Sequence, residues 1–183
     1  MNQESFTESI PYGTLGMIAL ESSKHIGQKV DNYISEWRNA RDSEHTATIQ
    51  FSGYKQDSYL INASCPRFGS GEAKGIISKS VRGLDLYLLV DVCNHSLTYS
   101  VSGHDNHMSP DDHYQDLKRI IAAVGGKARR ITVIMPFLYE SRQHKRSSRE
   151  SLDCALALQE LTNMGVESII TFDANAQSKD SLE

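Results

Sequence analysis

Residues 131–173, ITVIMPFLYESRQHKRSSRESLDCALALQELTNMGVESIITFD, decide the fold. Residues 131–136 form a nearly continuous apolar run of strand length, and 166–173 form a second one after a segment with helical spacing. Strands that are apolar throughout and alternate with helices indicate a parallel sheet covered by helices on both faces. We therefore expect an α/β fold in which a right-handed crossover makes the two strands parallel, so that their carboxyl ends lie at the same edge of the sheet.

Cations gather between these two strands, at the predicted start of the helix. They are Arg142, His144, Lys145, Arg146 and Arg149. The capping box Ser147-x-x-Glu150 predicts that the helix begins near Ser148, where free N–H groups and the positive dipole end favour an anion. The basic loop and Asp173 should face one crevice at the carboxyl edge, where ligands of open α/β sheets bind. This pattern favours a phosphate ligand with a metal, and a solvated loop is the alternative.

The other elements follow from apolar periodicity. Runs of strand character occur at 15–20, 46–54, 57–66, 76–81 and 84–92. Helices are predicted at 22–38 and at 110–124, the second opened by Ser109 and stopped by Gly125-Gly126. The first helix has one apolar face, made of Ile26, Val30, Tyr33, Ile34 and Trp37. Residues 93–108 are interpreted as a long polar loop, in which scattered histidines indicate no metal site because no ligand spacing repeats.

Composition limits the class of protein. With 183 residues, net charge −4 and 39% hydrophobic residues, we expect one globular domain over 14–176, a polar arm at 1–13 and a polar tail at 177–183. The acidic balance argues against a general nucleic-acid binder. Three separated cysteines, no signal peptide and no long apolar run favour a cytoplasmic protein without disulfides or a membrane span, and Cys154 is expected in the core.

Several motifs occur in the order found in one known family. RFGSGE at 67–72, SVRGLDLYLLVDV at 80–92, ITVIMPFLYESRQHKRSSRES at 131–151 and TFDAN at 171–175 carry the likeness. Over about residues 65–176 the chain resembles the N-terminal domain of the ribose-phosphate diphosphokinases, the phosphoribosyl diphosphate synthetases. The resemblance implies a phosphoribosyltransferase-like fold and transfer of diphosphate from ATP to ribose 5-phosphate.

The resemblance also assigns roles to residues. It implies ATP contacts by Arg142 and Gln143, and by Phe68 and Glu72 from a neighbouring subunit. Magnesium would lie at the positions of the family's acidic–histidine motif, here Asp173 and Asn175. Ser80 and Arg82 match positions near an effector phosphate site.

Departures from the family pattern leave a second hypothesis open. Ser70, His144 and Asn175 stand where the family usually has Asp, Asp and His. The family's second, ribose-phosphate-binding domain is absent, so we expect this chain alone to be inactive. It would work in a homo-oligomer, or with a complete synthetase as a non-catalytic nucleotide-binding regulatory subunit. An RNA-binding basic loop is a third interpretation.

Overall fold

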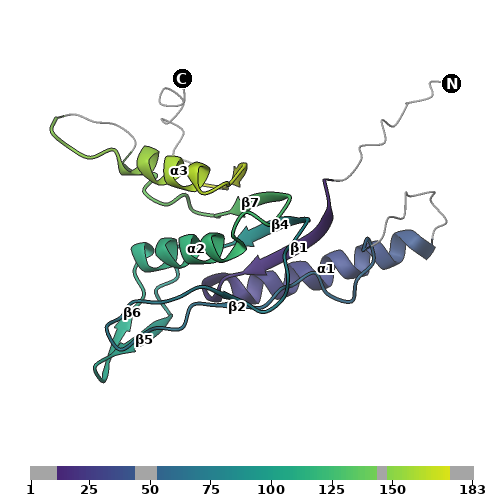
Figure 1. Ribbon diagram of the computed structural model, residues 1–183, viewed down its shortest axis with the longest axis horizontal. Helices are drawn as coiled ribbons and strands as arrows, with labels where there is room; N and C mark the ends of the chain where they lie inside the picture. Colours follow the sequence, from purple (N-terminus) through teal and green to yellow (C-terminus); the bar gives the residue numbers. More distant parts are fainter. Residues whose placement is uncertain (1–11, 44–52, 144–147, 174–183) are drawn as a thin grey trace.

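A computed structural model describes residues 12–43, 53–143 and 148–173 of the chain. Its centre is a four-stranded sheet in the order β1-β4-β7-β8, with every neighbouring pair parallel. The strands are β1 (Thr14–Ala19), β4 (Leu84–Leu89), β7 (Arg130–Ile134) and β8 (Ser168–Ile170). The predicted parallel α/β sheet is confirmed (Figure 1).

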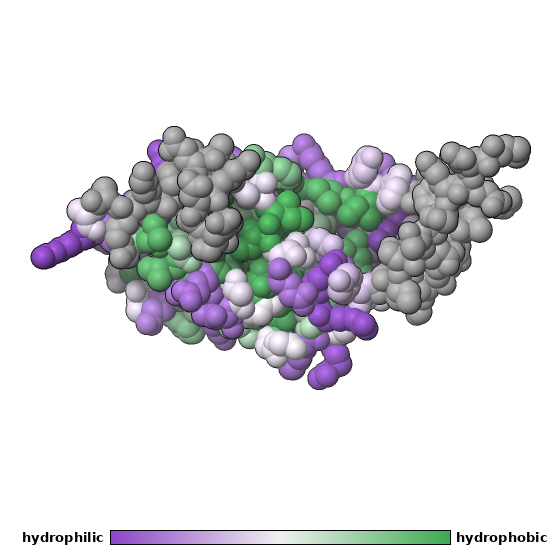
Figure 2. Space-filling model, turned by 90° about the horizontal axis from the view of Figure 1, so that it is seen from above, coloured by the Kyte–Doolittle hydropathy of each residue, from purple (hydrophilic) through white to green (hydrophobic). Residues whose placement is uncertain are grey.

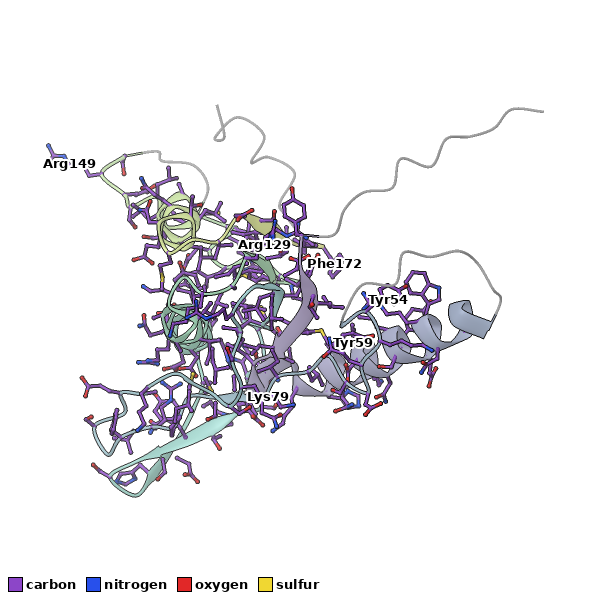
Figure 3. All side chains as sticks on the ribbon, turned by 45° about the vertical axis from the view of Figure 1, so that its right-hand side comes forward. Tyr54, Tyr59, Lys79, Arg129, Arg149 and Phe172 are labelled. Carbon is purple, nitrogen blue, oxygen red and sulfur yellow. The ribbon has the colours of Figure 1, made fainter. Side chains whose placement is uncertain are left out.

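Helices lie on both faces of this sheet. The helices α2 (Pro110–Val124) and α3 (Asp153–Asn163) connect β4 to β7 and β7 to β8, and both pack on the same face. Helix α1 (Lys24–Ser43) lies on the other face, after the short 3-10 turn η1 (Glu21–Ser23) (Figure 3). Leu86 and Leu88 of β4 are fully buried beneath α2 and α3, as expected for a central strand.

Helix α2 begins and ends as predicted. The Ser109 side chain accepts a hydrogen bond from the Asp112 N–H, and the Asp112 carboxylate accepts one from the Ser109 N–H. Gly125 ends the helix in the left-handed conformation. Asp112 therefore caps the start of α2, as helix capping predicts for this acidic stretch.

Helix α1 is present as predicted, but most of its apolar face is exposed, and only Val30 and Ile34 border a groove beside the sheet. Gly27 lets the helix approach β1 so closely that an added Cβ would lie 2.3 Å from the Ala19 Cβ. The buried Asp31 carboxylate accepts hydrogen bonds from the Tyr59 N–H at 2.6 Å and the Ser58 hydroxyl at 2.8 Å. The side of α1 that packs on the domain thus carries small and polar groups, whereas Ile26, Tyr33 and Trp37 are exposed and Ile34 is half-buried.

Two antiparallel hairpins extend from the sheet. β2 (Ala63–Ser64) pairs with β3 (Ile76–Ile77), and nearby Leu60 forms a parallel bridge with Met17 of β1. β5 (Thr98–Val101) and β6 (His104–His107) form a hairpin where the sequence predicted a polar loop, so that prediction was wrong. Most of the predicted strand at 46–54 lies outside the described residues.

The turn of the β5–β6 hairpin explains this correction. Ser102 and Gly103 have φ of 52° and 81°, and positive φ at both central residues is the geometry of a two-residue hairpin turn. The strand β5 alternates exposed and half-buried residues, which is the period of a strand that packs on one side. Among the described residues, no helix is long and apolar enough to cross a membrane.

Replacing Asp31 by Ala should destabilise the protein by about 3 kcal/mol, because two hydrogen bonds to a buried carboxylate are lost and the Tyr59 N–H stays buried without an acceptor. Urea unfolding measures this difference. The matched control is Asn32→Ala, since Asn32 is exposed and bonds only Gln28 among the described residues; it should change stability by less than about 0.5 kcal/mol. Equal losses in both variants would contradict the role of Asp31.

Candidate functional site

A crevice of about 280 Å³ lies at the carboxyl edge of the sheet, between the ends of β4 and β7 and the start of α2. Its lining residues are Val92, Cys93, Pro110, Phe137, Tyr139, Glu140, Ser141 and Arg142. Apolar and aromatic side chains form most of the wall, and a cation stands at one side. A crevice of this size and composition is typical of a site that holds part of a small organic ligand.

Two segments of the chain lie at this edge, one after β7 and one after β8. Phe137, just after β7, forms a parallel bridge with Asp173, and the Asp173 N–H donates to the Pro136 carbonyl at 3.1 Å. The parallel pairing of β7 and β8 therefore brings the loop after β7 and the Asp173 segment side by side. The predicted meeting of the basic loop with Asp173 at one edge is confirmed for the described part of that loop.

Charged groups surround Cys93 at this edge. The Cys93 N–H donates to the Asp91 carboxylate at 2.9 Å, and the Asp91 N–H donates to the Ser22 hydroxyl at 3.1 Å. Burial raises the pKa of the Cys93 thiol; the Asp91 and Asp173 carboxylates also raise it, while Arg142 lowers it. Arg142, Asp91 and Asp173 therefore all influence the Cys93 thiol at this edge of the sheet.

Asp91 was missed by the sequence analysis. It directly follows the apolar run of β4, so the rule that drew attention to Asp173 at the end of β8 applied equally here. The run 84–92 was interpreted as a strand throughout, whereas β4 ends at Leu89. That difference hid a carboxylate at the ligand-binding edge.

Gln143 links the loop after β7 to the segment before α3. Its side-chain amide donates to the Ser151 carbonyl at 2.8 Å, and its own carbonyl accepts from the Cys154 N–H at 3.4 Å. These bonds tie the loop to the start of α3. Arg142, next to it, is exposed and borders the crevice.

Helix α3 begins at Asp153, so the predicted start near Ser148 was wrong. Ser147 lies outside the described residues, and the N-cap Leu152 makes no side-chain capping bond. Carboxylates surround this helix end: burial raises the pKa of Glu140, and Asp153 and Asp111 raise it further. These carboxylates add negative charge near the start of α3, while His144, Lys145 and Arg146 of the basic loop lie outside the described residues.

Tyr139, in the wall of the crevice, stacks on Tyr114 of α2. The Tyr139 and Tyr114 rings stack with centroids 4.3 Å apart and 7° between their planes, and the Tyr139 hydroxyl donates to Asp111 at 2.7 Å. Burial, followed by this hydrogen bond, raises the pKa of Tyr139. Arg149, from the other end of the basic segment, points away from the molecule (Figure 3).

The loop at 67–72 is the tip of the β2–β3 hairpin. The Phe68 N–H donates to the Glu72 carbonyl at 2.7 Å, Gly71 has φ of 91°, and the Ser70 hydroxyl bonds the Glu72 carboxylate at 3.0 Å. Phe68 is half exposed. Within the described part of the chain, no hydrogen bond, ion pair or ring contact joins Phe68 or Glu72 to the loop that carries Arg142.

Ser80 and Arg82 lie away from the crevice. They precede β4 at its amino end, the opposite edge of the sheet, where both are exposed and the Arg82 N–H donates to the Ser80 hydroxyl at 3.4 Å.

In the described residues no three His, Cys, Asp or Glu side chains form a group that could hold a metal ion. The carboxylates of Asp91 and Asp173 are hard oxygen donors of the kind Mg²⁺ prefers, and Mg²⁺ usually takes one or two carboxylates and completes its shell with water and phosphate. These two residues therefore fit magnesium held jointly with a phosphate ligand. Asn175 lies outside the described residues.

The parallel sheet and its carboxyl-edge crevice define an open α/β ligand-binding domain. A family model described as the N-terminal domain of ribose phosphate pyrophosphokinase matches residues 15–165. The chain belongs to this family.

Curated relatives agree. Ribose-phosphate pyrophosphokinase B of Dictyostelium discoideum is 30% identical over 63% of this chain and 32% of its own length. Ribose-phosphate pyrophosphokinase 1 of Schizosaccharomyces pombe is 32% identical over 63% of this chain and 25% of its own length. The chain thus spans a third or less of these two relatives.

A solved structure supports the fold alone. The phosphoribosylpyrophosphate synthetase from Mycobacterium smegmatis aligns with 88% of this chain and 43% of its own, with a TM-score of 0.55 and 21% identity.

Alkylation of Cys93 tests the charge balance in the crevice. Because the thiolate is the nucleophile and nearby carboxylates disfavour it, Asp91→Asn should lower the pKa of Cys93 and speed iodoacetamide labelling at pH 8. Arg142→Ala should slow it. Mass spectrometry follows the modified cysteine, and Cys93→Ser is the control, since Cys154 is buried and burial raises the pKa of Cys65 to about 12. Unchanged rates in both variants would contradict this arrangement.

Proposed function

We propose that this chain is the nucleotide-binding N-terminal domain of a ribose-phosphate diphosphokinase, which transfers diphosphate from ATP to ribose 5-phosphate when the second domain is present. The observation that carries the proposal is Arg142 beside a crevice at the carboxyl edge, within a chain that belongs to this family. Its relatives are named ribose-phosphate pyrophosphokinases, which supports this reaction class.

Arg142 would bind the nucleotide from the side of β7. Its guanidinium is always charged and presents several donors, so it suits an oxygen-rich anion or the face of a base. Gln143 would contribute mainly by fixing the loop, because its amide is already bonded to Ser151. Phe68 and Glu72 would close a nucleotide site from a neighbouring subunit, since neither contacts the Arg142 loop within the described chain.

Magnesium would be held by Asp173 with Asp91, and with Asn175 as the family pattern suggests. The ion would supply charge neutralisation on the phosphate oxygens. The residues of this chain would orient the nucleotide and balance its charge, which is the protein's main contribution to phosphoryl transfer. Ser80 and Arg82, at the opposite edge, would form a separate effector phosphate site, and the reaction would take place in the cytoplasm.

A second candidate function is a non-catalytic nucleotide-binding subunit that regulates a complete synthetase. The loop at 67–72 favours it: Ser70 stands where the family usually has Asp, and its hydroxyl is bonded to Glu72. A neutral hydroxyl lacks the charge of the family's carboxylate, so the loop would position a nucleotide without supplying that charge.

Replacing Arg142 by Ala should weaken Mg–ATP binding at least about tenfold, because a charge-assisted contact contributes about 1.5–3 kcal/mol. Isothermal titration calorimetry measures the affinity, with magnesium in excess. The matched control is Arg149→Ala, which removes an equal charge from a side chain that points into solvent and should leave the affinity unchanged (Figure 3). Equal losses in the two variants would make the effect one of net charge and contradict an ATP contact by Arg142.

An activity assay separates the two functions. We expect no phosphoribosyl diphosphate from this chain alone, because the ribose-phosphate site belongs to the second domain. Adding the chain to a complete synthetase should change the rate or its response to nucleotides if the chain is a regulatory subunit. An unchanged rate despite intact ATP binding would exclude regulation of that synthetase, and turnover by the chain alone would contradict the assignment of the ribose-phosphate site.

A further inference from the structure

A second cavity lies at the carboxyl end of β1, between α2 and the β5–β6 hairpin, and we call it the hairpin pocket. Its volume is about 290 Å³, and the structure describes every residue that lines it. The walls come from the segment after β1, the base of the 67–72 loop, the hairpin and α2, represented by Leu20, Arg67, Tyr99 and Asp116. The hairpin pocket shares no lining residue with the crevice at Cys93, so the two cavities are separate.

Most of the wall of the hairpin pocket is apolar. Leu20, Met108 and Ile120 are buried side chains that line it, and half-buried Leu97 lies at its hairpin side. Pockets for small molecules usually have volumes of about 300–1,000 Å³ and combine apolar walls with a few polar groups. At the lower end of this range, the hairpin pocket suits an organic molecule smaller than a nucleotide.

Arg67 is a nearly buried cation in this wall, and most of its donors are unused. Its side chain is 10% exposed. One terminal nitrogen donates to the Asp116 carboxylate at 2.9 Å, and the Tyr99 ring lies 4.7 Å from the guanidinium carbon. Within the described residues, the other two guanidinium nitrogens make no hydrogen bond. Because a guanidinium presents five N–H donors in a fixed fork, Arg67 can bind a planar anion without releasing Asp116.

The Asp116 carboxylate is shared between two cations. It accepts a hydrogen bond from Arg67 at 2.9 Å and another from Arg119 at 2.7 Å. Two buried guanidinium groups therefore divide one carboxylate. A second carboxylate, brought by a ligand, would complete a set of two cations and two anions, which is the arrangement that makes buried charge tolerable.

The other nearby carboxylates already have partners. Asp112, which also acts on Asp116, accepts hydrogen bonds from the Ser109 N–H and hydroxyl, both at 2.9 Å. Glu21 lines the pocket but its side chain is 62% exposed, and it pairs with Lys24 at 3.2 Å. Water screens the charge of an exposed group, so Glu21 opposes an anion at Arg67 only weakly.

Hydrogen bonds fix the other polar wall of the hairpin pocket. The His113 Nε2 donates to the Asn94 carbonyl at 2.7 Å, since a carbonyl oxygen can only accept. The Asn94 amide in turn donates to the Ser22 carbonyl at 2.9 Å. The buried Ser22 hydroxyl accepts from the Asp91 N–H, and its own proton has no acceptor among the described residues. Ser22 therefore offers a donor to a ligand in a wall that is already held in place.

We propose that the hairpin pocket binds a small carboxylic acid with an apolar body. The carboxylate would lie on the unused donors of Arg67, and the apolar body would lie against Leu20, Met108 and Ile120. The Ser22 hydroxyl is a further donor for a ligand oxygen. The proposal depends on the contents of this pocket and does not rest on the proposed function.

Magnetic resonance of the methionine methyl groups tests the site, because Met108 lies in its wall. The probes are phenylacetate and 4-methylpentanoate, one aromatic and one branched acid. Both should shift the Met108 signal, assigned with Met108→Leu, and the Kd should be below about 1 mM. Phenylacetamide has the same shape without the charge and should bind at least about tenfold more weakly. Adsorption to the open hydrophobic surface across the middle of the molecule would not distinguish the acid from the amide (Figure 2).

Replacing Arg67 by Gln should weaken phenylacetate binding at least about tenfold, because the charged fork is lost. The matched control is Arg129→Gln. It removes an equal charge from an exposed residue that lies apart from the β5–β6 hairpin, and it should leave the affinity unchanged (Figure 3).

A second pair of variants leaves the ion pairs intact. Thr98 is an exposed residue of β5 that lines the pocket, so Thr98→Trp should obstruct its mouth and abolish binding. Ser100 is exposed on the same strand and does not line the pocket, so Ser100→Trp should bind as the unmodified chain does. Circular dichroism verifies that all four variants are folded.

Three results would overturn the proposal. The first is an unchanged Met108 signal with both acids up to about 10 mM, since useful sites bind more tightly than this. The second is equal affinity for phenylacetate and phenylacetamide, which would mean apolar adsorption only. The third is full binding by a folded Arg67→Gln or Thr98→Trp variant. If Arg67→Gln does not fold, the comparison of Thr98→Trp with Ser100→Trp decides.

Discussion

The parallel pairing of β7 with β8 is the constraint on which the candidate site depends. Because the crossover through α3 returns the chain in the same direction, the loop after β7 and the segment after β8 emerge together. Arg142 and Asp173 come from positions about 30 residues apart, yet both act on Cys93. An antiparallel return would place them at opposite ends of the sheet, so the charge balance of the crevice follows from topology.

The crevice combines charges of both signs. Arg142 and Glu140 both line it, and the Asp153 and Asp111 carboxylates act with burial to raise the pKa of Glu140. The Tyr139 ring, which stacks on Tyr114, forms part of the same wall.

Sequence patterns predicted most of the sheet because a buried parallel strand leaves an unmistakable apolar run. The same patterns predicted the start of α3 too early, because a capping box at Ser147 is a local signal and the carboxylates near Asp153 come from distant segments. The sequence patterns predicted the apolar periodicity of α1, but they did not predict which side of the helix is buried. Periodicity shows that a stripe exists, whereas only the contacts of Gly27 and Asp31 show which side the domain uses. In the candidate site, Asp173 was predicted from its position at the end of a strand. The hydrogen bond from the Gln143 side chain to the Ser151 carbonyl has no signal in the sequence.

The unpredicted β5–β6 hairpin lies against the loop at 67–72. The Arg67 guanidinium lies 4.7 Å from the Tyr99 ring of β5, and a Cβ at Gly71 would lie 3.3 Å from Val101. Arg67 also bonds the Asp116 carboxylate of α2 at 2.9 Å, so two hairpins and a helix share one guanidinium. Through Arg67, the β5–β6 hairpin and α2 therefore both support the loop that carries Phe68 and Glu72, and a change in either element would move that exposed loop relative to the domain.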